Sequence, residues 1–141
     1  VLGRFLNMGV EAYNFVSALN CILAQRLVRI ICEHCKVRVR YPGKILEEGG
    51  LEFELWKNFE FAEGKGCIEC SGTGFRGRTA IHELLDMSDQ IRELILARKP
   101  SAEIMRAARE QGLVTLRESA IQRVQDGLTT LQEINKVTFI E

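Results

Sequence analysis

The sequence predicts a mainly α-helical protein with a small β-containing subdomain, in the mixed α+β class. Apolar residues recur every three or four positions over long stretches of the chain, which is typical of amphipathic helices. Two Cys-x-x-Cys pairs stand close enough in sequence to share one small lobe. Several helix-capping signals follow in the last third of the chain. We therefore expect a long N-terminal helix, a tetracysteine metal lobe and a C-terminal bundle of short helices.

The long N-terminal helix is expected to run from Glu11 to Ile31. Its apolar positions recur at helical spacing: Ala12, Phe15, Val16, Leu19, Ile22, Leu23, Leu27 and Ile30. Cys21 lies within this run and is expected to be a small buried hydrophobe. Arg26 and Arg29 would project from neighbouring positions on the helix surface. Arg26, beside the apolar stripe, would either reach water over its aliphatic stem or make an ion pair or anion contact at a boundary.

Four of the five cysteines form the pairs Cys32-Glu-His-Cys35 and Cys67-Ile-Glu-Cys70, which we call the two knuckles. A two-residue spacer lets both thiolates of a pair turn toward one point. Two such knuckles can close a tetrahedron of sulfur atoms around Zn²⁺, with Zn–S distances near ~2.3 Å. Four cysteine ligands leave no open coordination position, so this zinc would be structural.

The cysteines allow other interpretations. Two disulfides, a redox motif or unpaired cysteines in the core would also fit the spacing. However, Val1 to Gly9 has no signal-peptide pattern, and a cytosolic chain with such cysteines more often uses them for metal. His34 could replace one of the cysteine ligands, although a solvated position within the knuckle is the more ordinary role for it.

The segment between the knuckles carries two turn signals, Tyr41-Pro42-Gly43 and Glu48-Gly49-Gly50. Its aromatic residues could suggest a surface for stacking bases. They are not interleaved with basic residues, and the stretch 52–63 is acidic, so we expect a small satellite core around the metal instead. After the second knuckle, the stretch from Thr79 to Leu85 has strand character, with Ile81 and Leu84 facing inward.

The remainder of the chain is expected to be helical. One helix, capped by Ser88 or Asp86, would run to Arg98, and the next would span residues 100–110. Two capping boxes, Thr115-Leu-Arg-Glu118 and Thr130-Leu-Gln-Glu133, would start the last two helices. The expected domain organisation is a helical segment over 1–31 that continues from an upstream core, a metal-binding subdomain with its strand over 32–85, and a helical subdomain over 86–141.

Composition and motifs exclude several functions for the chain by itself. Nineteen basic and nineteen acidic residues cancel, which argues against a nucleic-acid binder. The longest apolar run contains two arginines, which argues against a membrane span. A phosphate loop needs Gly-x-x-x-x-Gly-Lys followed by Ser or Thr. Gly64-Lys65 is followed by Gly66 and lacks the upstream glycine, so it is not a phosphate loop. We therefore expect no catalysis by the isolated chain.

Several sequence blocks occur together in a fixed order. They are Met8-Gly-Val-Glu11, Ala18-Leu-Asn20, Leu23-Ala-Gln-Arg-Leu-Val-Arg29, the first knuckle, Gly66-Cys-x-x-Cys-x-x-Thr-Gly-Phe-Arg-Gly-Arg-Thr-Ala-Ile-His-Glu83, Ala107-Ala-Arg-Glu-Gln-Gly112 and Thr115-Leu-Arg-Glu118. In this combination, which covers nearly the whole chain, the sequence resembles the C-terminal portion of the type II secretion and type IV pilus assembly ATPases.

The resemblance implies a function for the full-length parent. That parent would be a cytoplasmic hexamer, peripheral at the inner membrane through platform proteins, that uses ATP and Mg²⁺ to power protein export or pilus extension. The fragment itself would have a structural role or a coupling role within that ATPase, and it would not be catalytic. The resemblance also implies that Cys32, Cys35, Cys67 and Cys70 bind a structural metal. It implies that Arg78 approaches the nucleotide site, and that Arg26 and Arg29 lie near the same interface.

Two other classes of function are weighed against this one. Cys67-x-x-Cys70-x-Gly-x-Gly74 is also the repeat unit of the J-domain chaperone zinc region, which would make the chain a zinc-dependent polypeptide-binding module. That family repeats the unit four times, whereas it occurs once here. A zinc-ribbon module for nucleic acid would instead show salt-dependent binding to DNA or RNA.

Overall fold

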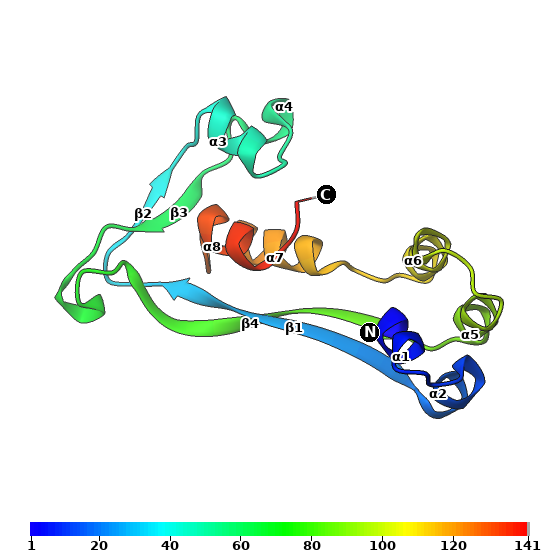
Figure 1. The fold of residues 1–141 in the computed structure, drawn as a ribbon. Coiled ribbons are helices and arrows are strands. Elements are labelled where there is room, and N and C mark those ends of the chain that lie inside the picture. The colour runs from blue at the N-terminus through cyan, green and yellow to red at the C-terminus, as the bar shows by residue number, and fades with distance from the viewer. Residues whose placement is uncertain (141) are drawn as a thin grey trace. The chain divides into compact units, whose positions relative to one another are not determined.

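The computed structural model describes residues 1–140 (Figure 1). Its helices are α1 (Leu2–Asn7), α2 (Ala12–Ala18), α3 (Gly43–Glu48), α4 (Phe53–Trp56), the 3₁₀ helix η1 (Ile68–Cys70), α5 (Asp89–Leu96), α6 (Ser101–Glu110), α7 (Leu116–Gln125) and α8 (Leu131–Val137). Its strands are β1 (Cys21–Ile31), β2 (Lys36–Val39), β3 (Phe61–Gly64) and β4 (Phe75–Asp86). The mixed α+β class is confirmed.

The expected helix over residues 11–31 is wrong. Helix α2 ends at Ala18, the backbone is extended at Leu19 with ψ 132°, and the chain continues as β1. The apolar positions of this stretch fit a helix by spacing, but β1 is rich in branched aliphatic residues and pairs with β4. Arg26 and Arg29 therefore lie on a strand, where residues three apart face opposite sides rather than neighbouring ones.

The strands form two two-stranded sheets, β1 with β4 and β2 with β3. β2 and β3 run antiparallel, with Lys36 opposite Gly64. The predicted strand from Thr79 to Leu85 is confirmed within β4. Ile81 is fully buried as expected, whereas Leu84 is 53% exposed, so its inward orientation is wrong. The side chains of a strand alternate between faces, and an odd spacing of three separates these two residues.

The chain forms two compact units, and each is described by itself. The first comprises Val1–Ala24 and Glu83–Val114. Its core joins α2, α5 and α6 through Ala12, Phe15, Val16, Met87, Ile91, Ile95, Ala107 and Ala108. The Arg92 guanidinium donates hydrogen bonds of 2.8 Å to the carbonyls of Met87 and Leu19, so it satisfies a backbone acceptor just beyond α2.

The second unit comprises Gln25–His82 and Thr115–Glu141. Its core contains Val28, Tyr41, Leu46, Leu51, Phe61, Ile81, Ala120, Val124, Leu131 and Ile134. The aromatic residues between the knuckles do gather, with ring centroids of Tyr41 and Phe61 4.8 Å apart. However, they pack with residues of α7 and α8 as part of this core, so the expected satellite core around the metal is wrong.

The C-terminal helices begin where the capping signals predict. Ser88 caps α5, and the Thr115 box caps α7 with both of its hydrogen bonds present. Thr130 caps α8, accepting from the Glu133 N–H, but the Glu133 carboxylate bonds to Arg29 and Lys136. The second capping box is thus half formed, because a tertiary ion pair takes its carboxylate.

The two units do not coincide with the ranges 1–31, 32–85 and 86–141, which stay a prediction of domain organisation. Among residues 1–140, no helix is both long and apolar enough to cross a membrane.

Candidate metal centre

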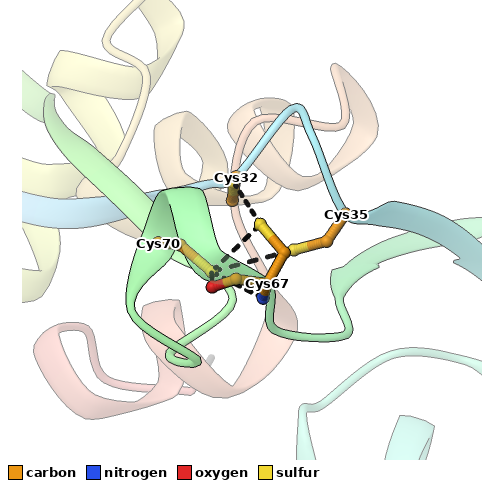
Figure 2. Close-up of side chains that lie close together, drawn as sticks. All are labelled: Cys32, Cys35, Cys67 and Cys70. Carbon is orange, nitrogen blue, oxygen red and sulfur yellow. Dashed lines mark hydrogen bonds between the residues drawn. The ribbon is translucent and has the colours of Figure 1, made fainter.

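The four knuckle cysteines come together within the second unit. Cys32 follows β1 directly, Cys35 precedes β2, and Cys67 and Cys70 lie at the start and end of the turn that contains η1. Figure 2 shows their side chains pointing toward one another from these two segments. All four sulfur atoms lie within 4.8 Å of one another, so the cluster could hold a metal ion.

The sulfur–sulfur distances suit a tetrahedral ion. Four sulfurs bound at ~2.3 Å to a central ion at tetrahedral angles would lie about 3.8 Å apart. The Sγ atoms of Cys32 and Cys67 are 3.8 Å apart, those of Cys35 and Cys70 3.9 Å, and those of Cys67 and Cys70 3.7 Å. A disulfide needs about 2.0 Å, and the five cysteines are free thiols in this structure.

Backbone amides point at the sulfurs and fix their positions. The N–H groups of Cys67 and Gly74 donate to the Cys70 Sγ at 3.2 and 3.1 Å, and the Gly66 N–H donates to the Cys35 Sγ at 3.3 Å. Burial alone would raise the pKa of the Cys70 thiol, but the amide donors outweigh it and lower the pKa to about 6. Such donors stabilise thiolate charge, which is what a metal ligand carries.

Burial has the opposite net effect on the neighbouring thiol. It raises the pKa of Cys35 to about 11, although the Gly66 amide opposes the rise. A thiol with a pKa raised in this way ionises readily only when a cation replaces its proton. The donor set of four thiols, two of them strongly buried, therefore fits a thiophilic metal ion.

Glycines allow the two segments that carry the knuckles to approach closely. A Cβ on Gly64 would collide with the backbone of Gly74, and one on Gly74 would collide with Gly64. A Cβ on Gly66 would lie 2.7 Å from the carbonyl oxygen of Gly72. The Gly64–Gly74 contact lets the Gly74 N–H reach the Cys70 sulfur, so these glycines shape the centre directly.

Arg29 lies beside the centre and links it to α8. Its guanidinium stacks over the Phe75 ring at 4.1 Å and bonds to Glu133 Oε1 at 2.7 Å. Phe75 directly follows Gly74, whose amide bonds to Cys70. The sequence did not indicate this link, because Glu133 resembles an ordinary capping-box carboxylate.

The other candidate residues lie apart from the cluster or at its surface. Arg78 is exposed, and within residues 1–140 its side chain makes no hydrogen bond or ion pair. Arg26 is exposed and donates to the carbonyl of its neighbour Gln25, and its contact with an anion at a boundary stays a prediction. His34 is exposed within the first knuckle, outside the cysteine cluster. Cys21 is exposed, so its expected burial is wrong, because β1 directs it to solvent.

A comparison with protein-family models matches residues 1–136 to the type II/IV secretion system protein family. The chain belongs to that family. It is 45% identical to a type IV pilus assembly ATPase PilB of Thermus thermophilus over 93% of this chain, which is 15% of that relative. It is 36% identical to PilB of Pseudomonas aeruginosa over 97% of the chain and 24% of the relative. With a type II secretion system protein E of Aeromonas hydrophila it shares 36% identity over 96% of the chain and 26% of the relative.

The chain therefore spans about a quarter or less of these relatives. Membership of the type II/IV secretion family confirms the resemblance drawn from the sequence blocks.

Proposed function

We propose that this chain is the metal-stabilised C-terminal part of a hexameric secretion or pilus-assembly ATPase. The observation that carries the proposal is the family match over residues 1–136, combined with relatives that are named as pilus assembly ATPases. ATP hydrolysis with Mg²⁺ would take place elsewhere in the longer protein, because the printed sequence contains no phosphate loop. No observation favours the chaperone-like alternative over this one.

The metal is proposed to be zinc, with Cys32, Cys35, Cys67 and Cys70 as its ligands. When bound, zinc would supply structural cross-linking and no open site for chemistry. The sulfur spacing near 3.8 Å supports this assignment, as do the amide donors to Cys35 and Cys70. Binding would supply folding free energy to the second unit, since the unfolded chain has no preformed site.

We propose that residues of this chain couple the metal centre to helix α8. The cysteines hold Gly74 in place, Gly74 sets the position of Phe75, and Phe75 supports the guanidinium of Arg29. Arg29 in turn holds Glu133 at the start of α8. A movement imposed on β1 or β4 by the longer protein would thus be transmitted to α8 through rigid contacts.

Arg78 is proposed to approach nucleotide phosphate in the assembled hexamer. Its exposed guanidinium has no partner side chain among the described residues, so it is free to make bidentate contacts with phosphate oxygens. Arg26 is a second candidate on the same grounds. Arg29 is a weaker candidate, because Glu133 and Phe75 already engage its guanidinium.

The longer protein is proposed to act in the cytoplasm, peripheral to the inner membrane, docked on secretion or pilus platform proteins. Support comes from relatives named for type IV pilus assembly and type II secretion. We propose no nucleic-acid partner and no membrane span for this chain. The balanced charge of the chain supports the absence of a nucleic-acid partner.

The test is a pair of cysteine variants in the longer protein. Cys67→Ser should lose zinc and lower both ATPase activity and export, because a knuckle ligand is gone. Cys21→Ser is the matched control, since Cys21 is exposed and outside the cluster, and it should keep metal and activity. Full zinc content and activity in Cys67→Ser would overturn the proposed metal role, and absence of ATPase activity in the unmodified protein would overturn the proposed motor.

A further inference from the structure

The Thr73 side chain makes hydrogen bonds on both sides of Gly74, the glycine whose amide donates to the Cys70 sulfur. Its hydroxyl donates to the Cys70 carbonyl at 2.7 Å, with the Phe75 carbonyl oxygen 3.0 Å away as a second acceptor. The same hydroxyl oxygen accepts from the Phe75 N–H at 3.2 Å. One hydroxyl therefore ties a residue that carries a knuckle sulfur to the first residue of β4.

Gly74 connects the two knuckles through its own backbone. Its N–H donates to the Cys70 Sγ at 3.1 Å, and its carbonyl oxygen accepts from the Cys32 N–H at 2.9 Å. The residue is buried and has φ +79°, in the left-handed region that glycine adopts readily. A side chain that fixes the orientation of Gly74 therefore fixes one amide donor of the metal centre and one link between its two halves.

Backbone hydrogen bonds hold the earlier part of this turn. The Gly72 N–H donates to the Cys67 carbonyl at 2.8 Å, and the Thr73 N–H donates to the Cys70 carbonyl at 3.2 Å. The Thr73 hydroxyl continues this set of bonds into β4. Removal of the hydroxyl would leave the turn closed up to Thr73 and would loosen the residue that follows, which is Gly74.

A threonine in a turn often bonds to nearby backbone groups and does no more than stabilise the turn. Thr73 differs in the position of its partners, because they enclose Gly74 and one of them belongs to a proposed metal ligand. Thr73 is also exposed, so its methyl group adds little to the core of the second unit. The hydroxyl is therefore the part of this side chain that acts on the metal centre.

We propose that Thr73 is a positioning residue of the metal centre, whose hydroxyl orients the Gly74 amide toward the Cys70 sulfur and so slows loss of the metal ion. The ion is a thiophilic divalent cation held by the four knuckle sulfurs. Four thiolates carry more negative charge than such an ion cancels, and an amide dipole aimed at a sulfur stabilises the excess. This inference rests on the metal site of the proposed function and adds to it a residue that is not a ligand.

Cadmium allows a direct measurement of the hydrogen bond from Gly74. Cd²⁺ is thiophilic and has spin-active isotopes, so scalar coupling between the metal and an amide proton reports an N–H···S bond to a ligating sulfur. The chain loaded with cadmium should show this coupling for the amides that donate to knuckle sulfurs, those of Gly74, Cys67 and Gly66. Cys67 and Gly66 are internal references, since neither lies between the groups that Thr73 joins.

Thr73→Val removes the hydroxyl and nearly keeps the shape of the side chain. We expect it to lose the Gly74 coupling, to keep the Gly66 coupling, and to release its metal to a chelator about fivefold faster, the effect of one hydrogen bond. Thr73→Ser keeps the hydroxyl without the methyl group and should behave like the unmodified chain. Ser71→Ala is the matched control, because Ser71 is exposed in the same turn and its hydroxyl makes no hydrogen bond within residues 1–140. This control should keep both the coupling and the metal.

An unchanged Gly74 coupling and unchanged metal release in Thr73→Val would overturn the proposal. Equal losses in Thr73→Val and Thr73→Ser would also overturn it, because the methyl group would then be the essential part. If Thr73→Val does not fold, Thr73→Ser decides alone: a retained Gly74 coupling supports the role of the hydroxyl, and a lost one refutes it. An unmodified chain that binds neither cadmium nor zinc would overturn the metal site itself, which is distinguishable because no variant would then differ from it.

Discussion

Arg29 and Glu133, separated by more than a hundred residues, form a 2.7 Å ion pair that joins β1 to the start of α8. The same carboxylate also lies 3.3 Å from the Arg29 backbone N–H and 3.0 Å from the ammonium of Lys136. Its side chain is only 9% exposed, whereas that of Arg29 is 45% exposed. The pair therefore secures the C-terminal helix to the strand that leads into the first knuckle.

Stability should depend on pH through Glu133. The hydrogen bond from Arg29 lowers the pKa of this carboxyl from its ordinary value of 4.5 to about 2, against a smaller opposing effect of burial. A lowered carboxyl pKa adds stability that is complete above the ordinary value and is lost as pH falls through the folded value. The contribution of Glu133 should therefore decline between about pH 4.5 and pH 2.

Glu133→Gln tests this dependence. The variant should lose about 1–2 kcal/mol of unfolding free energy at pH 7, because a charge-assisted hydrogen bond becomes a neutral one. Urea unfolding at several pH values should show the two proteins converging toward pH 2. The quantity to compare is the difference between them, since acid also releases a cysteine-bound metal from both proteins. A constant difference across this range would contradict the assigned role of the carboxylate.

The close approach of Gly64 and Gly74 should be necessary for metal binding. Gly64→Ala places a Cβ against the Gly74 backbone, so the amide of Gly74 must withdraw from the Cys70 sulfur. We expect weaker metal retention in competition with a chelator. Gly72→Ala is the control, because Gly72 has φ +77° but a Cβ added there would meet no atom within 4 Å. This variant should keep its metal and lose only about 1–2 kcal/mol of stability through backbone strain. Equal metal retention in the two variants would show that the contact is unimportant.

Arg78 and Arg29 should behave differently in the longer protein. Arg78→Ala should lower ATPase activity and export while zinc content and unfolding stay unchanged, because its exposed side chain supports nothing within the described residues. Arg29→Ala should instead loosen α8, which hydrogen exchange can measure, because it removes the partner of Glu133. If Arg78→Ala unfolds the second unit, that arginine is structural. If it leaves hydrolysis and export at parental levels in an assembled hexamer, the nucleotide role is wrong.

The chain by itself should neither bind nor hydrolyse ATP appreciably. Its only Gly-Lys dipeptides are Gly43-Lys44 and Gly64-Lys65, and neither continues as a phosphate loop. Equilibrium dialysis with labelled ATP and a phosphate-release assay check this. Saturable binding at micromolar ATP would reveal a nucleotide site that neither the sequence motifs nor the fold indicates.

The sequence was most informative where one local signal determines the structure. Ser88, Thr115 and Thr130 each cap the predicted helix, because the side-chain acceptor satisfies an amide a few residues away. The four cysteines were likewise identified by spacing, and the structure brings their sulfurs together. Neither feature requires knowledge of the rest of the chain.

Prediction failed where partners distant in sequence decide the outcome. The stretch that became β1 has apolar spacing compatible with a helix, and only pairing with β4 makes it a strand. The expected burial of Cys21 was wrong for the same reason, because Cys21 lies at the start of β1 and is exposed there. Glu133 was assigned to a local capping box, whereas Arg29 takes its carboxylate in the folded chain. The Gly64–Gly74 contact is invisible in sequence, because it joins two backbones that meet only after folding.

Zinc content and zinc coordination of the purified chain test the central claim most directly. X-ray absorption at the zinc edge, together with elemental analysis, should give one zinc per chain with four sulfur neighbours at ~2.3 Å. Cys67→Ser should lower both the sulfur count and the retained metal, while Cys21→Ser should change neither. A folded chain that contains no zinc and whose four knuckle thiols all titrate freely would contradict the account.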